Sequence, residues 1–286
     1  MTSIRTILCP VDFSAATQRQ VEFGVGLARL FGARLVLHHN ESVLSAGAAV
    51  GWMYATDHAT APRESVGSKL DALTAYTRGI ETDLRMTEGP ASVAVLAVAE
   101  AEQADLIILS THHATTDDHT SLTETIVNRG HRTVLVLHEA SQEPGTLQFE
   151  RDQTEVPQIA LVPTDLTPES RAAVRFAFGL ARVLPIHILL VHFLKHGGID
   201  NEALACDALR VMIPEDLLAR TLIDVREDEP AHGIMQMASD LHAACIIMGE
   251  HTRSPLRRWL TRDTSHAVLH QAHCPVWYVP GEAMAA

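Results

Sequence analysis

The chain has 286 residues, of which 47% are hydrophobic and 20% charged, and its formal net charge is −13 with histidine neutral. That length accommodates two domains of ordinary size, and so acidic a surface repels nucleic acid, which we exclude as a partner. Apolar runs are strand-sized, and none approaches the roughly 20 residues of a membrane-spanning helix. The N-terminal residues show no signal-peptide pattern. We therefore expect a cytoplasmic protein with no membrane partner.

The four cysteines are widely separated and form no C-x-x-C pair: Cys9, Cys206, Cys245 and Cys274. Three of them lie in or beside apolar runs, where a thiol usually behaves as a small buried hydrophobe. The sequence therefore predicts neither a disulfide framework nor a cysteine zinc site.

The first half of the chain alternates between strand-like and helix-like patterns. Apolar runs predict strands at 4–10, 35–39, 80–86, 106–109 and 133–137. Ser14 is a natural N-cap for the first helix and Gly32 stands where its C-cap is expected. Further helices are predicted at 68–78, 90–103 and 121–129, whereas 41–67 has no regular pattern.

The second half repeats this alternation. Its predicted strands are 159–163, 186–193, 222–225, 245–248 and 276–279. Its predicted helices are 169–184, 231–241 and 263–271, with a helical region at about 201–218. Short apolar strands separated by helices are typical of a parallel sheet that is covered on both faces.

An internal repeat relates the two halves. Residues 10–39 match residues 163–192 without a gap when shifted by 153 positions, so that Pro10 meets Pro163, Asp12 meets Asp165 and His39 meets His192. The segment between the halves is polar and contains proline and glycine, as linkers do. We therefore predict a first domain at 1–140, a linker at 141–157 and a second domain at 158–286.

Several segments together resemble the universal stress protein family. They are P-V-D-F-S after the first strand, the helix ending G-L-A-R-L-F-G-A, a second strand ending in histidine, A-D-L-I-I-L and C-P-V-W-Y-V-P. The resemblance implies two α/β domains of the flavodoxin-like, adenine nucleotide alpha hydrolase-like fold. Each would be a five-stranded parallel sheet of order 3-2-1-4-5 with helices on both faces. It also implies that the domains pair through their last strands within one chain, and Pro275 fits such an edge strand.

Some members of that family bind ATP through a loop of pattern G-x2-G-x9-G-[S/T] after the fourth strand. Glycines let backbone N–H groups approach phosphates, and the helix that follows favours anions. In the second half Gly249 keeps the first position, but Thr252 and Arg262 replace the other glycines and Asp263 replaces the hydroxyl residue. A side chain at 262 and a carboxylate at 263 disfavour a phosphate there.

The loop of the first half departs further from the pattern. Ser110 and His113 stand at the first two positions, the loop is three residues short, and only Ser121 matches. Asp12 and Asp165 match the position that lies on the adenine side in ATP-binding members, but an aspartate there also suits a plain turn. We therefore expect no cofactor, with ATP or AMP as the alternative.

If either half binds a ligand, the crevice at the carboxyl ends of the first and fourth strands is the expected place. The candidate residues are Pro10, Val11, Asp12, His39, Ser110 and Ser121 in the first half, and Thr164, Asp165, His192, Gly249, Thr252, Arg262 and Asp263 in the second. A lone histidine such as His39 or His192 is more often a structural group than a catalyst.

Two loop clusters have both a functional and a plain interpretation. Arg253, Arg257, Arg258 and Arg262 could hold an anion, but charge runs on loops are usually solvated, and we favour that interpretation. The residue types of His112, His113, Asp117 and His119 suit zinc or nickel. Their spacing matches no metal motif, so we expect no metal there.

The sequence shows no G-x-S-x-G elbow, Walker loop or H-E-x-x-H motif, and we expect no catalytic residue and no enzyme. The leading hypothesis is a tandem stress-response factor that binds a small molecule or a protein through crevices with degenerate nucleotide loops. One alternative is an ATP- or AMP-binding sensor that uses the second half, and another is a phosphohydrolase of the same fold. A homodimer is a further expectation.

Overall fold

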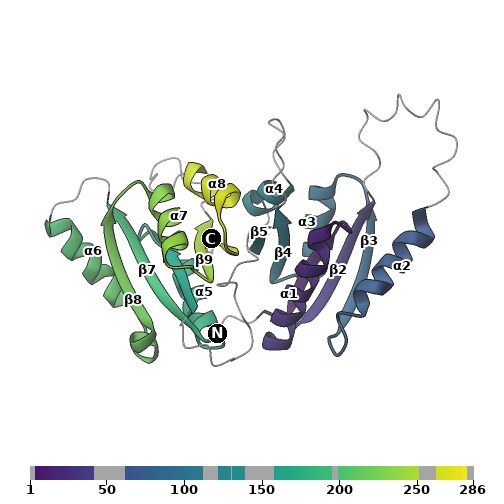
Figure 1. Ribbon diagram of the computed structural model, residues 1–286, viewed down its shortest axis with the longest axis horizontal. Coiled ribbons are helices and arrows are strands. Elements are labelled where there is room, and N and C mark those ends of the chain that lie inside the picture. The colour runs from purple at the N-terminus through teal and green to yellow at the C-terminus, as the bar shows by residue number, and fades with distance from the viewer. Residues whose placement is uncertain are drawn as a thin grey trace. The chain divides into compact units, whose positions relative to one another are not determined.

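The computed structural model describes residues 4–41, 62–111, 122–129, 131–138, 158–194, 199–250 and 262–281. Ten strands and the helices between them occupy these residues (Figure 1). In the first repeat they are β1 Thr6–Val11, α1 Ala15–Phe31, β2 Arg34–Glu41, α2 Pro62–Thr74, β3 Thr82–Glu88, α3 Ala91–Ala101, β4 Leu106–Thr111, α4 Leu122–Arg129 and β5 Thr133–His138. In the second they are β6 Gln158–Pro163, α5 Pro168–Ala181, β7 Ile186–Leu194, α6 Ile199–Met212, η2 Glu215–Arg220, β8 Thr221–Glu227, α7 Pro230–Asp240, β9 Cys245–Glu250, α8 Arg262–Gln271 and β10 Val276–Pro280.

The strands of the first repeat have the order β3-β2-β1-β4-β5, as the family resemblance implied. β1 pairs in parallel with β2 along its whole length, but with β4 only at Ile7 and Leu8. Helix α1 packs on this sheet through Gly24, where an added Cβ would collide with the thiol of Cys9. The helix ends at Gly32, whose φ of 64° confirms the predicted left-handed C-cap.

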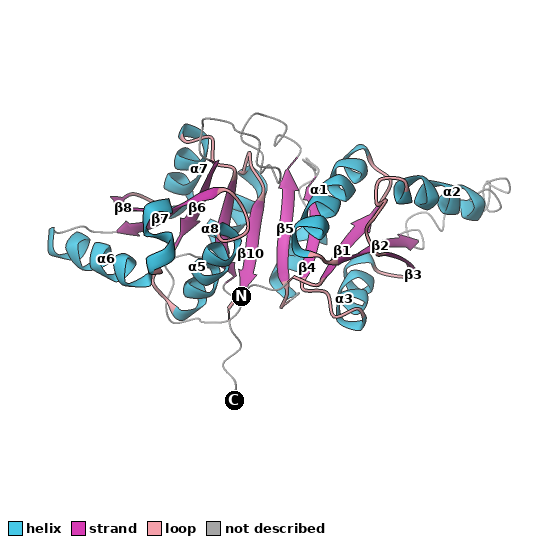
Figure 2. Cartoon of the chain, turned by 90° about the horizontal axis from the view of Figure 1, so that it is seen from below, coloured by secondary structure: helices cyan, strands magenta, loops and turns pink. Residues whose placement is uncertain are grey.

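The strands of the second repeat have the corresponding order, β10-β9-β6-β7-β8. β6 pairs in parallel with β7 along its whole length, but with β9 only at Ala160 and Leu161. β5, although it comes from the first repeat, pairs antiparallel with β10, where Leu135 lies opposite Trp277 (Figure 2). The prediction that the repeats pair through their last strands is confirmed.

Helices cover both faces of the second sheet. The ring of Phe176 on α5 lies 5.3 Å from that of Trp277 on β10, centroid to centroid. The next residue, Tyr278, donates its hydroxyl to the carbonyl oxygen of Ser265 on α8, at 3.3 Å. Because successive side chains of a strand point to opposite faces, α5 and α8 lie on opposite faces of the sheet. Helix α7 packs beside α8 (Figure 1).

Two predicted helices have wrong boundaries. The helix expected at 68–78 begins six residues earlier, at Pro62, and ends at Thr74. The helical region expected at 201–218 consists of two elements, because α6 ends at Met212 and a separate 3-10 helix, η2, begins after Pro214. Proline disfavours helical backbone in the residue before it and donates no hydrogen bond, which breaks the helix.

The core consists of the apolar residues of the strands together with those on the helix faces that cover them. Cys9, Cys245 and Cys274 are buried and Cys206 is half-buried, and all four thiols are free. Burial raises the pKa of the Cys274 thiol to about 12, so this thiol stays protonated at neutral pH.

The chain divides into two compact units, one of residues 3–109 and one that contains residues 110–286. The second unit therefore includes α4 and β5 of the first repeat. Among the residues that the structure describes, no helix has the length and apolar character needed to cross a bilayer.

Candidate functional site

The carboxyl ends of the first and fourth strands of each repeat are the expected ligand site, and the register explains why. β1 and β4 share only two paired positions, and so do β6 and β9, whereas β1 and β6 pair fully with their other neighbours. The first and fourth strands therefore part beyond these positions. In this topology, ligands bind where the two strands part.

In the second repeat, Asp165 directly follows β6 and builds the turn into α5. Its Oδ1 accepts the backbone N–H of Thr167 at 3.1 Å and the hydroxyl of Thr167 at 2.6 Å. Leu166 between them has φ 64°, a left-handed conformation that is unfavourable for a branched apolar residue. Thr167 in turn accepts the N–H of Ser170 and caps the helix. Asp165 thus supports the turn, the plainer of its two predicted roles.

In the first repeat, Asp12 supports the equivalent turn between β1 and α1. Its Oδ1 accepts the N–H of Ser14 and the hydroxyl of Thr17, both at 2.9 Å. Phe13 has φ 59°, and its ring lies 4.6 Å from that of His39. Ser14 is the N-cap, as predicted, but its side chain makes no capping hydrogen bond. Both repeats therefore keep an aspartate-supported turn that holds a bulky residue at positive φ.

The two histidines near the ends of the second strands each make a hydrogen bond to the backbone of the first strand's end. Nδ1 of His39 lies 2.9 Å from the carbonyl oxygen of Val11, and Nδ1 of His192 lies 2.8 Å from that of Thr164. A carbonyl oxygen only accepts, so each ring carries its proton on Nδ1 and leaves Nε2 as the acceptor of the neutral ring. Each histidine thus ties the end of the first strand to the second strand.

A glutamine side chain bridges the strand ends of the first repeat. Nε2 of Gln20 on α1 donates to the carbonyl oxygens of Pro10 and Ile108, at 2.7 and 2.8 Å, and so joins the ends of β1 and β4. The position related to Gln20 by the repeat is Ala173, which has no such group. Gln20 therefore braces the site between these strands in the first repeat, whereas Ala173 cannot do so at the equivalent position of the second.

A buried carboxyl group ends β9 in the second repeat. Glu250 follows Gly249 directly and is 4% exposed. Among the described residues, neither of its carboxyl oxygens has a hydrogen-bond partner. Burial raises its pKa to about 7. In the register Glu250 lies opposite Pro280, two residues beyond Tyr278, so its side chain lies on the α8 face of the sheet.

The remaining candidates are placed as follows. Ser110 is half-buried near the end of β4. Arg262 and Asp263 form the first turn of α8, but the structure does not describe their side chains. Ser121, Thr252, the arginines at 253, 257 and 258, and the loop with the metal-type side chains His112, His113, Asp117 and His119 lie outside the described residues. The predictions for these loops stay predictions.

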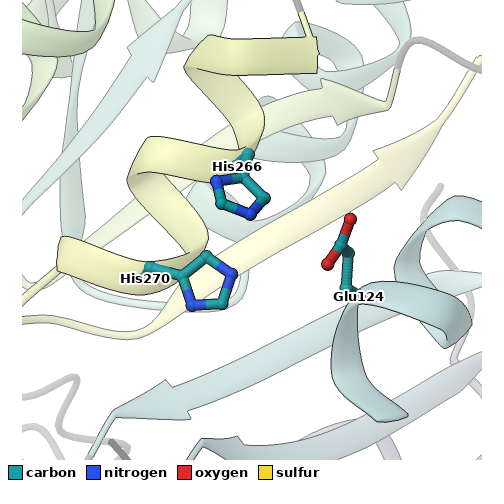
Figure 3. Close-up of side chains that lie close together, drawn as sticks. All are labelled: Glu124, His266 and His270. Carbon is teal, nitrogen blue, oxygen red and sulfur yellow. The ribbon is translucent and has the colours of Figure 1, made fainter. Parts of the chain in front are cut away.

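Sequence reasoning missed three features that the structure brings forward. The first is Glu250, because the nucleotide-loop motif does not specify the residue after its first glycine. A glutamate at the end of an apolar strand is nevertheless a signal, since buried carboxyl groups are rare. The second is Gln20, which lies within a predicted helix and has no distinguishing sequence signal. The third feature is a group of metal-ligand side chains, Glu124, His266 and His270, for which the i, i+4 spacing of the histidines was the available signal (Figure 3).

Fold and site together define a duplicated flavodoxin-like α/β protein, with an aspartate turn at the switch point of each repeat. The chain belongs to the universal stress protein family, whose sequence model matches residues 3–138 and 158–280.

Solved structures share this fold over nearly the whole chain. A universal stress protein from Archaeoglobus fulgidus DSM 4304 superposes with a TM-score of 0.70 at 14% identity, covering 98% of each chain. A putative universal stress protein from Pseudomonas aeruginosa UCBPP-PA14 gives 0.63 at 16% identity, covering 98% of this chain and 94% of the other. The comparison with curated proteins finds no match. At these identities the likeness concerns the fold.

Proposed function

We propose that this protein is a non-enzymatic stress-response factor that acts by binding a small molecule or a protein. The binding site would lie in the second repeat, at the carboxyl ends of β6 and β9. One observation carries the proposal: the buried carboxyl group of Glu250 lies beside the only position of the nucleotide loop that keeps its glycine, Gly249.

A carboxyl group in this place disfavours a triphosphate in either protonation state. Ionised, it repels phosphate oxygens in a setting of low dielectric constant. Protonated, it offers one O–H donor, whereas a phosphate cradle needs several converging backbone N–H groups. With a pKa of about 7, both forms are present near neutral pH. An uncharged or cationic polar group is a better partner, since the acid can donate to a carbonyl and the carboxylate can accept from an amine.

The absence of a catalytic role is part of the same proposal. Asp165 and Asp12 are already acceptors in their turns, and His39 and His192 hold backbone carbonyl oxygens. A phosphohydrolase needs a positioned base and a phosphate cradle together. The groups at these strand ends serve the turns, which supports binding in place of catalysis.

Thermal unfolding of the tag-free chain with Mg²⁺ and ATP, ADP or AMP tests the proposal. We expect no rise in melting temperature with ATP, for the wild type or for the matched variants Asp165→Ala and Asp12→Ala. A rise that Asp165→Ala removes and Asp12→Ala keeps would establish the nucleotide sensor instead. Steady phosphate release from ATP, lost in Asp165→Ala, would establish the phosphohydrolase.

A positive test uses Glu250 itself. Protein isolated directly from cells is denatured and the released small molecules are identified by mass spectrometry, for the wild type and for Glu250→Gln. We expect a neutral or cationic polar compound whose yield falls in the variant. Recovery of ATP from the wild type would contradict the proposal.

A further inference from the structure

The three side chains Glu124, His266 and His270 lie together on two helices of the unit 110–286. Each offers one ligand atom, and these atoms all lie within 4.8 Å of one another. Glu124 projects from α4, and both imidazoles project from the side of α8 that faces it (Figure 3). Glu124 is half-buried and the histidines are exposed, so an ion has open access from solvent.

We propose that these residues form a binding site for a divalent transition-metal ion of the zinc type, with water in the remaining position. Two imidazoles and one carboxylate are a ligand set that favours Zn²⁺, Cu²⁺ or Ni²⁺ over Mg²⁺ and Ca²⁺. The proposal concerns other residues than the His112 loop and does not depend on the proposed ligand at β6 and β9.

Helix geometry gathers the two histidines. Residues four apart lie one turn above each other on the same helix face, and the ring centroids of His266 and His270 are 4.3 Å apart. In a tetrahedral site with bonds of about 2.0–2.1 Å, the ligand atoms are about 3.3 Å apart. Small side-chain rotations therefore close the site, and no helix has to move.

The helix that carries the histidines is held to the sheet next to each of them. The carbonyl oxygen of Ser265 accepts the hydroxyl of Tyr278 from β10 at 3.3 Å. The carbonyl oxygen of Leu269 accepts from Nε2 of His138 on β5 at 2.8 Å. These carbonyls belong to the residues immediately before His266 and His270. Ligands on elements with fixed positions lose less freedom when an ion binds.

The pairing of β5 with β10 relates the last helix and strand of the two repeats by a local two-fold axis. These elements match under a shift of 142 positions instead of 153, because the second repeat is shorter between its second strand and its last helix. In the antiparallel pairing, Leu135 lies opposite Trp277, its equivalent under this shift. Under the same shift, Glu124 corresponds to His266. Equivalent positions near a two-fold axis face each other, as in any isologous contact. The repeats differ at this position, and a carboxylate therefore meets an imidazole instead of its own copy.

Titration of the tag-free, metal-stripped chain with ZnCl₂ by calorimetry tests the site. We expect one Zn²⁺ per chain at this site. Replacing a ligand should weaken binding by at least about 100-fold, since even outer-shell changes cost 10–100-fold. The variants are His266→Asn, His270→Asn and Glu124→Gln. Circular dichroism spectra and melting temperatures of the apo variants verify that they fold, as expected for exposed or half-buried side chains.

Two controls separate this site from other histidines. His232→Asn removes an exposed helical histidine that lies 3.2 Å from Asp228, a pair with one ligand too few. His112→Asn/His113→Asn/His119→Asn removes the loop histidines. Both should bind Zn²⁺ as the wild type does. Co²⁺ provides a second readout, because its visible absorption on binding should be lost in His266→Asn and kept in His232→Asn.

Three results would each overturn the proposal: no saturable binding of Zn²⁺, binding of wild-type strength in His266→Asn/His270→Asn, or binding that only the loop variant abolishes.

Discussion

Replacing Glu250 by glutamine should make the protein more stable above neutral pH. Burial raises the pKa of this carboxyl from 4.5 to about 7. Below pH 4.5 both the folded and the unfolded chain hold the proton, so the raised pKa adds no cost to the free energy of folding. Between about pH 4.5 and 7 only the unfolded chain releases it, so stability falls as the pH rises. Above pH 7 the cost is constant, at about 3 kcal/mol as an upper figure.

The assay is urea unfolding of the wild type and Glu250→Gln between pH 5 and 8, followed by far-ultraviolet circular dichroism and by tryptophan fluorescence, to which the buried Trp277 contributes. The contributions of groups that titrate in both proteins cancel in the difference between their free energies of unfolding. We expect a small difference at pH 5 and up to about 3 kcal/mol in favour of the variant at pH 8, or roughly 6–12 °C in melting temperature. The control Glu202→Gln, an exposed helical residue, should show no such trend. A difference between wild type and Glu250→Gln that stays constant with pH would refute the reasoning.

Two further substitutions test the packing of the separate units. Glu102→Gln should cost about 1–2 kcal/mol at pH 7, because its carboxylate accepts from Arg85 at 2.6 Å and Arg34 at 2.9 Å. Arg85 and Arg34 lower the pKa of Glu102, so this stability is lost as the pH falls through the pKa of Glu102 in the folded state. Equal denaturation midpoints of the wild type and Glu102→Gln at pH 7 would contradict the prediction. Gly233→Ala should destabilise by about 1–3 kcal/mol despite its better helix propensity, since the new Cβ would collide with the ring of Phe193. Phe193→Leu in the same chain should recover part of the loss, and a stabilising Gly233→Ala would show that this contact is not tight.

The fold was largely predictable from the sequence because its signals are local. Apolar runs gave all ten strands, and the match of residues 10–39 to 163–192 gave the duplication. The break between α6 and η2 also has a local signal, because Pro214 disfavours helical backbone in the residue before it. The pairing of β5 with β10 came from the family resemblance, because no local pattern specifies which edge strands meet.

The site was only partly predictable, since its chemistry depends on neighbours distant in sequence. Asp165 and His192 were found because they recur in the repeat, yet their hydrogen bonds show them supporting a turn and a strand end. The raised pKa of Glu250 follows from burial between elements that the sequence does not place side by side. Glu124 meets His266 only because two edge strands pair.

Comparison of the two repeats separates structural residues from candidate functional ones. The strand-end histidine makes the same hydrogen bond in both repeats, at 2.9 and 2.8 Å, and in both an aspartate accepts a backbone N–H and a threonine hydroxyl at the turn, so both serve the shared fold. The repeats differ at Gln20, where the second repeat has Ala173, and at Glu124, where it has His266. Where the residue differs between the repeats but the surrounding geometry is the same, the fold does not require a particular side chain at that position. Binding functions specific to this chain should therefore be sought at the differing positions, with the equivalent residue of the other repeat as the matched control.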